Sequence, residues 1–181
     1  RAERGGFDLL PANRELAGAE VELVELDRRE TRLKDALARV EGEYDYVLID
    51  CPPSLSLLTV NGLTAAQRVL IPMQCEYYAL EGLSDLVATI KRVRSNLNPQ
   101  LEIAGLLRTM YDPRNMLSQQ VSQQLEQHFK DKVYRTLVPR NVRLAEAPSY
   151  GVPAVLWDGA SKGAQAYLAL AAEILAQGQA A

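Results

Sequence analysis

The sequence predicts an α/β fold of the doubly wound class, in which helices cover both faces of a mostly parallel sheet. Short apolar runs at 45–50, 68–73 and 101–107 are typical of parallel strands that are buried on both faces. Apolar residues also recur at three- and four-residue spacing over 83–97, 117–125 and 167–175, which indicates amphipathic helices. This alternation favours a parallel sheet, because parallel strands need crossover connections.

The first forty residues add one strand and two helices to this scheme. The stretch Phe7–Leu10 predicts a strand, and the patterns over 15–26 and 31–41 predict helices. No strand pattern precedes Phe7, although doubly wound sheets usually begin with a central strand that leads into the first ligand loop. We therefore expect one domain over residues 1–181 that lacks the N-terminal strand and helix of its fold.

The composition favours a cytoplasmic protein with a hydrophobic core. Apolar residues make up 48% of the chain, and we expect neither a membrane span nor a secretory signal, because the apolar segments are too short. Cys51 and Cys75 each end an apolar run, so they are expected to be buried, reduced thiols. His128, the only histidine, is expected near the end of a helix, where positive charge is favourable.

The net charge of −3 is unevenly distributed. Residues 1–50 carry 8 basic and 13 acidic side chains, whereas residues 91–143 carry 10 basic and 4 acidic ones. A local basic surface binds phosphate-rich polymers even on an acidic protein, since attraction between charges is screened beyond about 8–10 Å. Two interpretations of the basic stretch stay open at this point, a nucleic-acid surface and a solvated helix face.

The segment 44–53, YDYVLIDCPP, carries the most chemical information. Asp50 ends the predicted strand, and the crevice at the carboxyl ends of parallel strands is where open α/β sheets bind ligands. A carboxylate at this place is suited to hold the Mg²⁺ of a nucleotide, usually through water. The pair Pro52-Pro53 prevents the strand from continuing. The alternative is an aspartate that only caps the turn.

Three longer strings resemble the ParA/Soj family of deviant Walker partitioning ATPases, which also includes the MinD proteins. These strings are YDYVLIDCPPSLSLLTVNGLTAA (44–66), VLIPMQCEYYALEGLSDL (69–86) and TLVPRNVRLAEAPSYGVPA (136–154). The likeness extends from about Phe7 to about Leu175. It implies chromosome or plasmid partitioning by a nucleoid-associated protein that binds ATP and Mg²⁺. The resemblance further implies an ATP-dependent homodimer, binding to DNA without sequence preference, and hydrolysis stimulated by a ParB-type partner.

The resemblance assigns roles to residues by position. Asp50 matches the Walker B aspartate, which acts on Mg²⁺ and water, and the rest of that motif is Cys51, Pro52 and Pro53. Base binding is implied for Thr109, Pro139, Arg140 and Asn141. DNA binding is implied for Arg114 and Arg143, with surface ion pairs as the alternative. A dimer face is implied for Glu76, Tyr77, Tyr78 and Glu81, with a helix N-terminus that has Glu in its first turn as the alternative.

The family's glycine-rich phosphate loop, with its lysines, and its second catalytic aspartate have no match in the sequence. Without those amide groups and lysines Asp50 has no nucleotide-bound metal to hold, so we expect this chain alone to bind no cofactor and to be inactive. A non-enzymatic, truncated paralogue that binds DNA or a partner is the main alternative. A MinD-like membrane-cycling ATPase is disfavoured, because residues 164–181 contain no Lys or Arg for a basic amphipathic helix.

Overall fold

The computed structural model describes residues 5–52 and 54–179. The chain divides into two compact units. The first, called here the sheet unit, comprises Arg1–Leu9, Leu70–Leu80 and Ala104–Ala181. The second, called here the helical unit, comprises Leu10–Val69 and Glu81–Ile103.

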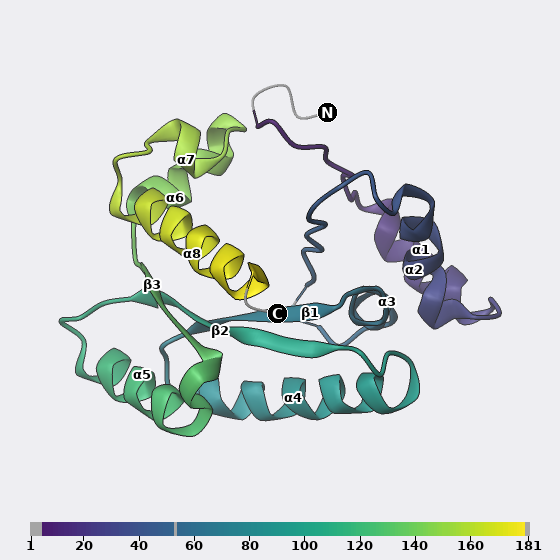
Figure 1. Cartoon of the computed structure of the whole chain (residues 1–181), viewed down its shortest axis with the longest axis horizontal. Helices are drawn as coiled ribbons and strands as arrows, with labels where there is room; N and C mark the ends of the chain where they lie inside the picture. The colour runs from purple at the N-terminus through teal and green to yellow at the C-terminus, as the bar shows by residue number, and fades with distance from the viewer. Residues whose placement is uncertain (1–4, 53, 180–181) are drawn as a thin grey trace. The chain divides into compact units, whose positions relative to one another are not determined.

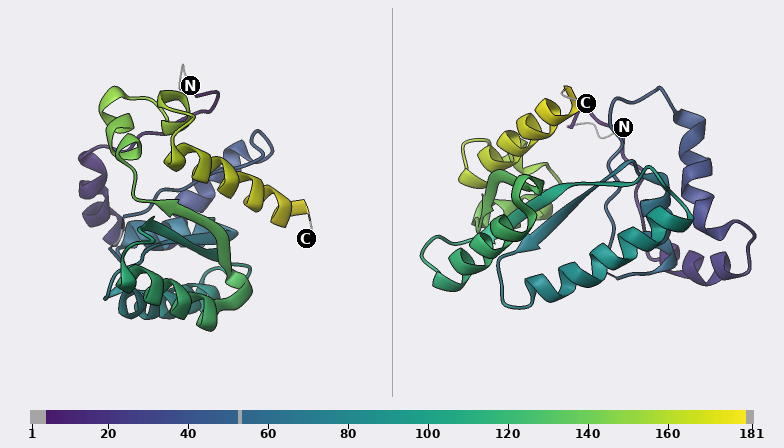
Figure 2. Two further views of the ribbon diagram at one scale, coloured as in Figure 1. Left: turned by 90° about the vertical axis from the view of Figure 1, so that its left-hand side faces the viewer. Right: turned by 60° about the horizontal axis from the view of Figure 1, so that its bottom comes forward.

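The sheet unit is built around three strands in the order β1-β2-β3. They are β1 (Arg68–Gln74), β2 (Glu102–Tyr111) and β3 (Val133–Pro139), and β2 pairs with β3 in parallel. The helix α5 (Met116–Phe129), which connects β2 to β3, lies on one face of the sheet, and α8 (Lys162–Gln179) lies on the opposite face (Figures 1 and 2). A parallel sheet with helices on its faces confirms the predicted fold class. β1 and β2 confirm the runs at 68–73 and 101–107, whereas β3 was not predicted.

The core of the sheet unit lies between the sheet and α8. Its buried centre consists of Leu107, Tyr134, Val138 and Leu170. On α8, Leu170 comes four residues after Ala166 and four before Ile174, both of which pack against this centre, so that one stripe of the helix is buried. α8 confirms the helix predicted over 167–175, although Tyr167, Ala171 and Leu175 of the predicted apolar pattern are exposed.

Short helices follow β3 in the sheet unit. They are α6 (Val142–Glu146), the 3-10 turn η4 (Ala147–Tyr150) and α7 (Ala154–Trp157). The rings of Tyr150 and Trp157 stack with centroids 3.8 Å apart. A further 3-10 turn, η3 (Lys130–Lys132), leads into β3. His128 lies in the last turn of α5, as predicted, with its Nδ1 2.7 Å from the carbonyl oxygen of Gln124.

The helical unit contains α1 (Glu15–Val24), η1 (Arg29–Thr31), α2 (Arg32–Leu37), η2 (Ala38–Val40) and α3 (Leu57–Ala65), and it holds most of α4 (Ala79–Asn96). The buried side chain of Asn61 joins these elements. Its Oδ1 accepts from the backbone N–H of Leu33, and its Nδ2 donates to the carbonyls of Arg29 and Leu57. The helices predicted over 15–26, 31–41 and 83–97 are confirmed in outline.

Two predicted strands are wrong. Residues 45–50 and Phe7–Leu10 have no regular secondary structure, and the apolar side chains of both segments are largely exposed, with Leu48 93% accessible. A strand needs a hydrogen-bonding neighbour, and in the described part of the chain the sheet contains only β1, β2 and β3. The apolar pattern is typical of a strand, but it carries no information about whether the backbone finds a partner.

No helix in the described ranges combines the length and the apolar character that crossing a membrane requires.

Candidate functional site

The segment around Asp50 is held against α3 in the helical unit. A Cβ added at Gly62 on α3 would stand 2.8 Å from the Sγ of Cys51 and 3.5 Å from a methyl group of Ile49. The segment is therefore anchored at Gly62, where the missing side chain lets it approach. Asp50 is exposed, and Pro52 is exposed beside it, whereas Pro53 lies outside the described residues.

The two cysteines differ in exposure. Cys75 is buried, as predicted, but Cys51 is exposed as a residue, so the prediction is wrong for it. The segment around Cys51 forms no strand, so no sheet encloses the residue, although its sulfur lies close to Gly62. Partial burial of this thiol, together with the neighbouring Asp50 carboxylate, raises the pKa of Cys51. The thiol is therefore a poor nucleophile at neutral pH.

The carboxyl ends of β2 and β3 lie side by side and form what we call the strand-end rim, residues 109–114 and 139–143. Tyr111 is in register with Pro139, and the N–H of Arg140 donates to the carbonyl of Tyr111 over 3.2 Å. The rim thus brings together two segments that are almost thirty residues apart in the sequence. All four residues assigned to the base pocket, Thr109, Pro139, Arg140 and Asn141, belong to it.

The side chain of Asn141 has a structural role at the rim. Its Oδ1 accepts from the N–H of Arg143 over 3.0 Å and caps the first turn of α6. The cap fixes the orientation of the carboxamide and directs its oxygen to the helix. Its Nδ2 group is a donor of the kind that recognises ring nitrogens of a base.

β2 is irregular where it reaches the rim. The register shifts between Arg108 and Tyr111, and Met110 has a φ of 52°. For a residue other than glycine this left-handed conformation is strained, and such strain is found most often at functional sites. The bulge interrupts the alternation of side chains next to Thr109, which is half-buried. Sequence periodicity gave no signal of it.

Arg114 and Arg143 both lie on the strand-end rim and are exposed. Arg114 makes a two-point contact with Asp112, with its Nε and one terminal nitrogen 3.1 and 3.0 Å from the two carboxylate oxygens. Arg143 lies 2.9 Å from Glu146 and 3.3 Å from Asp158. A hydrogen bond to Arg114 lowers the pKa of Asp112, whose carboxylate is also near the charge of Arg140. Three arginines are therefore gathered at the rim, each within the field of an acidic residue.

The string around Tyr77 is exposed. Tyr77 and Tyr78 are each 74% accessible, and their rings meet edge to face with centroids 5.1 Å apart. Glu76 is exposed beside them, and Glu81 lies in the first turn of α4. The helix-start interpretation is thus confirmed for Glu81, and the dimer-face interpretation stays a prediction.

Among the described residues no three His, Cys, Asp or Glu side chains gather into a metal-binding group. Nucleotide-bound Mg²⁺ is usually held by one or two carboxylates together with phosphates and water. Asp50, an exposed carboxylate on an anchored segment, offers the donor chemistry that such an ion needs. For the base, the rim offers the half-buried Thr109 and Pro139 and the fixed amide of Asn141. Each of these groups, taken by itself, therefore has donor chemistry of the kind that magnesium or a base requires.

Two charged residues that the sequence analysis did not single out hold the irregular middle of β3. Arg108 on β2 donates to the carbonyl of Tyr134 over 2.8 Å, and it also contacts Ser122 and Glu126 on α5. Glu173 on α8 accepts from the N–H groups of Arg135 and Thr136 over 2.8 and 3.0 Å. For Arg108, the available signal in the sequence was an arginine inside the apolar run of a buried strand.

The family model described as an AAA domain matches residues 2–103. The chromosome partitioning protein ParA of Caulobacter vibrioides is 54% identical over 98% of this chain, which covers 67% of that protein. The sporulation initiation inhibitor protein Soj of Bacillus subtilis is 56% identical over 95% of this chain, which covers 68% of Soj. The chain spans about two thirds of the length of the curated relatives it matches.

Solved structures give the same fold. A cobyrinic acid a,c-diamide synthase from Mycobacterium smegmatis, with a bound ATP analogue and magnesium, is 41% identical and superposes with a TM-score of 0.72 over 87% of this chain and 57% of its own. The cell division ATPase MinD of Pyrococcus furiosus superposes with a TM-score of 0.66 over 82% of this chain and 59% of its own. Its 23% identity supports a common fold and nothing more specific.

Proposed function

Because the chain belongs to the ParA/Soj family of chromosome-partitioning proteins, we propose that it is the part of a partitioning ATPase that carries the Walker B segment, the base-binding rim and the DNA-binding arginines. The observation that carries this proposal is identity of 54–56% with ParA and Soj proteins over nearly the whole chain. Identity at this level favours partitioning over the MinD-like alternative, whose solved representative is 23% identical.

In the full-length protein, ATP with Mg²⁺ would join two copies, and the dimer would bind DNA without sequence preference until a ParB-type partner stimulates hydrolysis. Asp50 would hold the metal through water, and the rim residues Thr109, Pro139 and Asn141 would enclose the base. Two copies would meet through the exposed pair Tyr77 and Tyr78. Tyrosine suits such a face because its ring is buried on contact while its hydroxyl keeps a polar partner.

DNA would bind at the strand-end rim through Arg114 and Arg143. Both side chains are exposed and lie at the carboxyl ends of neighbouring parallel strands, so they are available on one side of the sheet unit. Their present ion pairs with Asp112 and Glu146 are at the surface, where such pairs contribute little to stability. Replacement of these carboxylate partners by DNA phosphates therefore costs little free energy, and it is driven by counterion release.

A salt-titrated binding assay on a duplex of arbitrary sequence tests the DNA surface. We expect Arg114→Ala and Arg143→Ala each to weaken binding in low salt and to reduce the slope of log affinity against log salt by about one. Lys132→Ala is the matched control, because it removes one positive charge at the opposite end of β3. Equal effects of all three substitutions would indicate a general charge effect and contradict a DNA surface at the rim.

The nucleotide site is tested in the full-length protein with Asp50→Asn, which keeps the shape of the side chain and removes its charge. We expect magnesium-dependent ATP hydrolysis to be lost while the unfolding temperature stays within about two degrees. Glu43→Gln, an exposed acidic residue earlier in the same irregular stretch, is the control. Full hydrolysis by the Asp50→Asn variant would contradict the metal-binding role of Asp50.

A further inference from the structure

The irregularity in the middle of β3 lies between two opposite charges. Leu106 pairs with Val133 and Arg108 pairs with Leu137, so β3 carries more residues than β2 between these two pairs, and the excess falls at residues 134–136. Such a bulge leaves backbone groups without their usual ladder partners. In this protein the partners come from two side chains on different elements.

The two side chains bind opposite ends of the same peptide group. The peptide between Tyr134 and Arg135 points its carbonyl oxygen to a guanidinium nitrogen of Arg108, 2.8 Å away, and its N–H to a carboxylate oxygen of Glu173, 2.8 Å away. The next peptide repeats the arrangement, with Arg108 3.5 Å from the carbonyl of Arg135 and Glu173 3.0 Å from the N–H of Thr136. The positive and negative charges thus align with the peptide dipoles, which strengthens both sets of hydrogen bonds.

Both charged side chains are themselves fixed. Arg108 is 4% accessible, and a second guanidinium nitrogen contacts Ser122 and Glu126 on α5. Glu173 also accepts from the hydroxyl of Thr136 over 2.8 Å, and the neighbouring residues Leu170 and Ile174 anchor α8 in the core. The bulge is therefore connected to α5 on one face of the sheet and to α8 on the other.

We propose that Arg108 and Glu173 are positioning residues, which act as a clamp on the bulge of β3 and thereby place residues 139–143 of the strand-end rim. The physical link is short, because Thr136 is three residues before Pro139, and the second register shift, between the pairs Arg108–Leu137 and Tyr111–Pro139, has its extra residue on β2. Loss of either charge would leave the bulge free to slide against β2, and a slip of one residue turns every later side chain to the other face. The consequence for DNA binding by Arg143 rests on the proposed function, whereas the clamp itself does not.

Amide hydrogen exchange on the full chain tests the clamp directly. Glu173→Gln keeps the size of the side chain but offers one acceptor oxygen and one donor group to two N–H donors, so one of them loses its partner. We expect exchange in the segment 133–141 to accelerate about tenfold or more, while α5 changes less than about twofold. In Arg108→Lys the single ammonium group cannot reach both α5 and the bulge. This variant is therefore expected to accelerate amide exchange in the same segment, 133–141.

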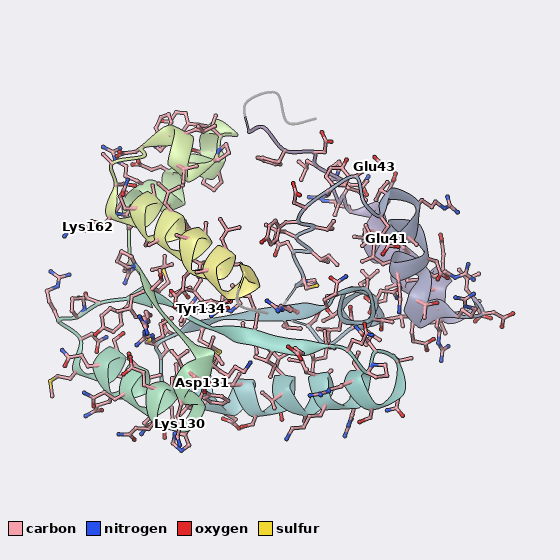
Figure 3. All side chains as sticks on the ribbon, viewed as in Figure 1. Glu41, Glu43, Lys130, Asp131, Tyr134 and Lys162 are labelled. Atoms are coloured by element: carbon pink, nitrogen blue, oxygen red, sulfur yellow. The ribbon has the colours of Figure 1, made fainter. Side chains whose placement is uncertain are left out.

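The matched control is Asp131→Asn, which removes a carboxylate from the turn before β3; Figure 3 labels it beside Lys130 and Tyr134. It is expected to leave exchange in 133–141 unchanged. A spectroscopic signature adds a readout that a general loss of stability would not reproduce. The amide protons of Arg135 and Thr136 should resonate downfield in the unmodified chain and move upfield in Glu173→Gln, with smaller shifts elsewhere.

Three outcomes separate the ideas. Local acceleration with weaker DNA binding by Glu173→Gln supports the clamp and its positioning role. Unchanged exchange in 133–141, or acceleration that is equal in α5, overturns the clamp. Local acceleration with undiminished DNA binding overturns the positioning role if Arg143→Ala does weaken DNA binding. If Arg143→Ala has no effect on DNA binding either, the proposed DNA surface is wrong. The exchange data then still decide whether the clamp exists.

Discussion

The ring of Tyr134 lies directly against the backbone of Gly105, in the space that a side chain on β2 would otherwise fill. A Cβ at Gly105 would stand 2.7 Å from Cε2 of the ring and 2.9 Å from the carbonyl oxygen of Lys132. Real Cβ atoms do not approach backbone oxygens this closely. The contact holds a buried aromatic ring of the core at the start of the β3 bulge.

Gly105→Ala is therefore expected to destabilise the sheet unit by about 1–3 kcal/mol, because the ring and β3 must both move away. Urea denaturation followed by circular dichroism measures the change. Gly82→Ala on α4 is the matched control, since a Cβ there meets nothing within 4 Å and alanine favours a helix by about 0.5–1 kcal/mol. Destabilisation of both variants to the same extent would contradict the steric explanation.

Asn61→Ala is expected to destabilise the helical unit by about 2–4 kcal/mol. The substitution leaves the N–H of Leu33 and the carbonyls of Arg29 and Leu57 without the partner that joins them, in a site where Asn61 is 4% accessible. Exchange of amides in 29–37 measures the effect locally. Asn96→Ala, which removes one exposed hydrogen bond to Arg92 within α4, should cost less than about 0.5 kcal/mol. Similar costs for the two changes would show that Asn61 is not the link.

Helices α4, α5 and α8 were predictable from the sequence because each has a buried stripe within its own length, whereas α2 was predicted from its apolar spacing although none of its residues is buried. Leu170 and Ile174, for example, repeat at the spacing of a helix whose neighbour is the sheet of the same unit. β1 and β2 were predictable because their short apolar runs contain buried residues, such as Ile71 and Leu106. The run at 45–50 has an equally clear apolar pattern, but a strand also requires partners that are distant in sequence, and periodicity carries no information about these.

The third strand was missed because its pattern is broken where it bulges. Arg135 and Thr136 interrupt the apolar run of Val133–Pro139, and the two are accommodated only because Glu173, almost forty residues later, binds their N–H groups. Thr109, Pro139, Arg140 and Asn141 lie at or next to the ends of strands, and their role in base binding stays a prediction. The clamp and the bulge at Met110 depend on register, which composition and spacing leave undetermined.

Acidification is expected to weaken the hold of Glu173 on β3. Burial alone would raise the pKa of Glu173, but hydrogen bonds from the N–H groups of Arg135 and Thr136 outweigh it and lower the pKa below its ordinary value. The charged form is therefore favoured by folding, so its contribution is fully present above the unfolded pKa and is lost as the pH falls through the folded pKa. The positive charge of Arg135 also lowers the pKa of Glu173.

Denaturant unfolding of the unmodified chain and of Glu173→Gln, compared between pH 7 and pH 3, measures this contribution. We expect a stability difference of about 1–3 kcal/mol at neutral pH that shrinks in acid, where the carboxylate is protonated in both folded and unfolded chains. Asp112 also has a lowered pKa, so comparison with Glu173→Gln at each pH is needed to isolate one group. A difference that grew on acidification would have the wrong sign for this mechanism.

Met110 is the residue at which the bulge of β2 depends on an unusual backbone conformation. Its φ of 52° is readily adopted by glycine and is worst for a β-branched side chain. Met110→Gly is therefore expected to be more stable than Met110→Val by about 1–2 kcal/mol, as measured by urea denaturation. Since the Met110 side chain is 45% accessible, loss of its packing costs little in either variant.

The matched pair is Glu102→Gly and Glu102→Val at the exposed first residue of the same strand. There the order should reverse, because a regular extended conformation favours valine and penalises glycine. If valine were the more stable residue at both positions, β2 would continue to the rim as a regular strand in solution. Tyr111 and the rim residues after it would then turn to the other side of the sheet, and the proposed base pocket would be lost.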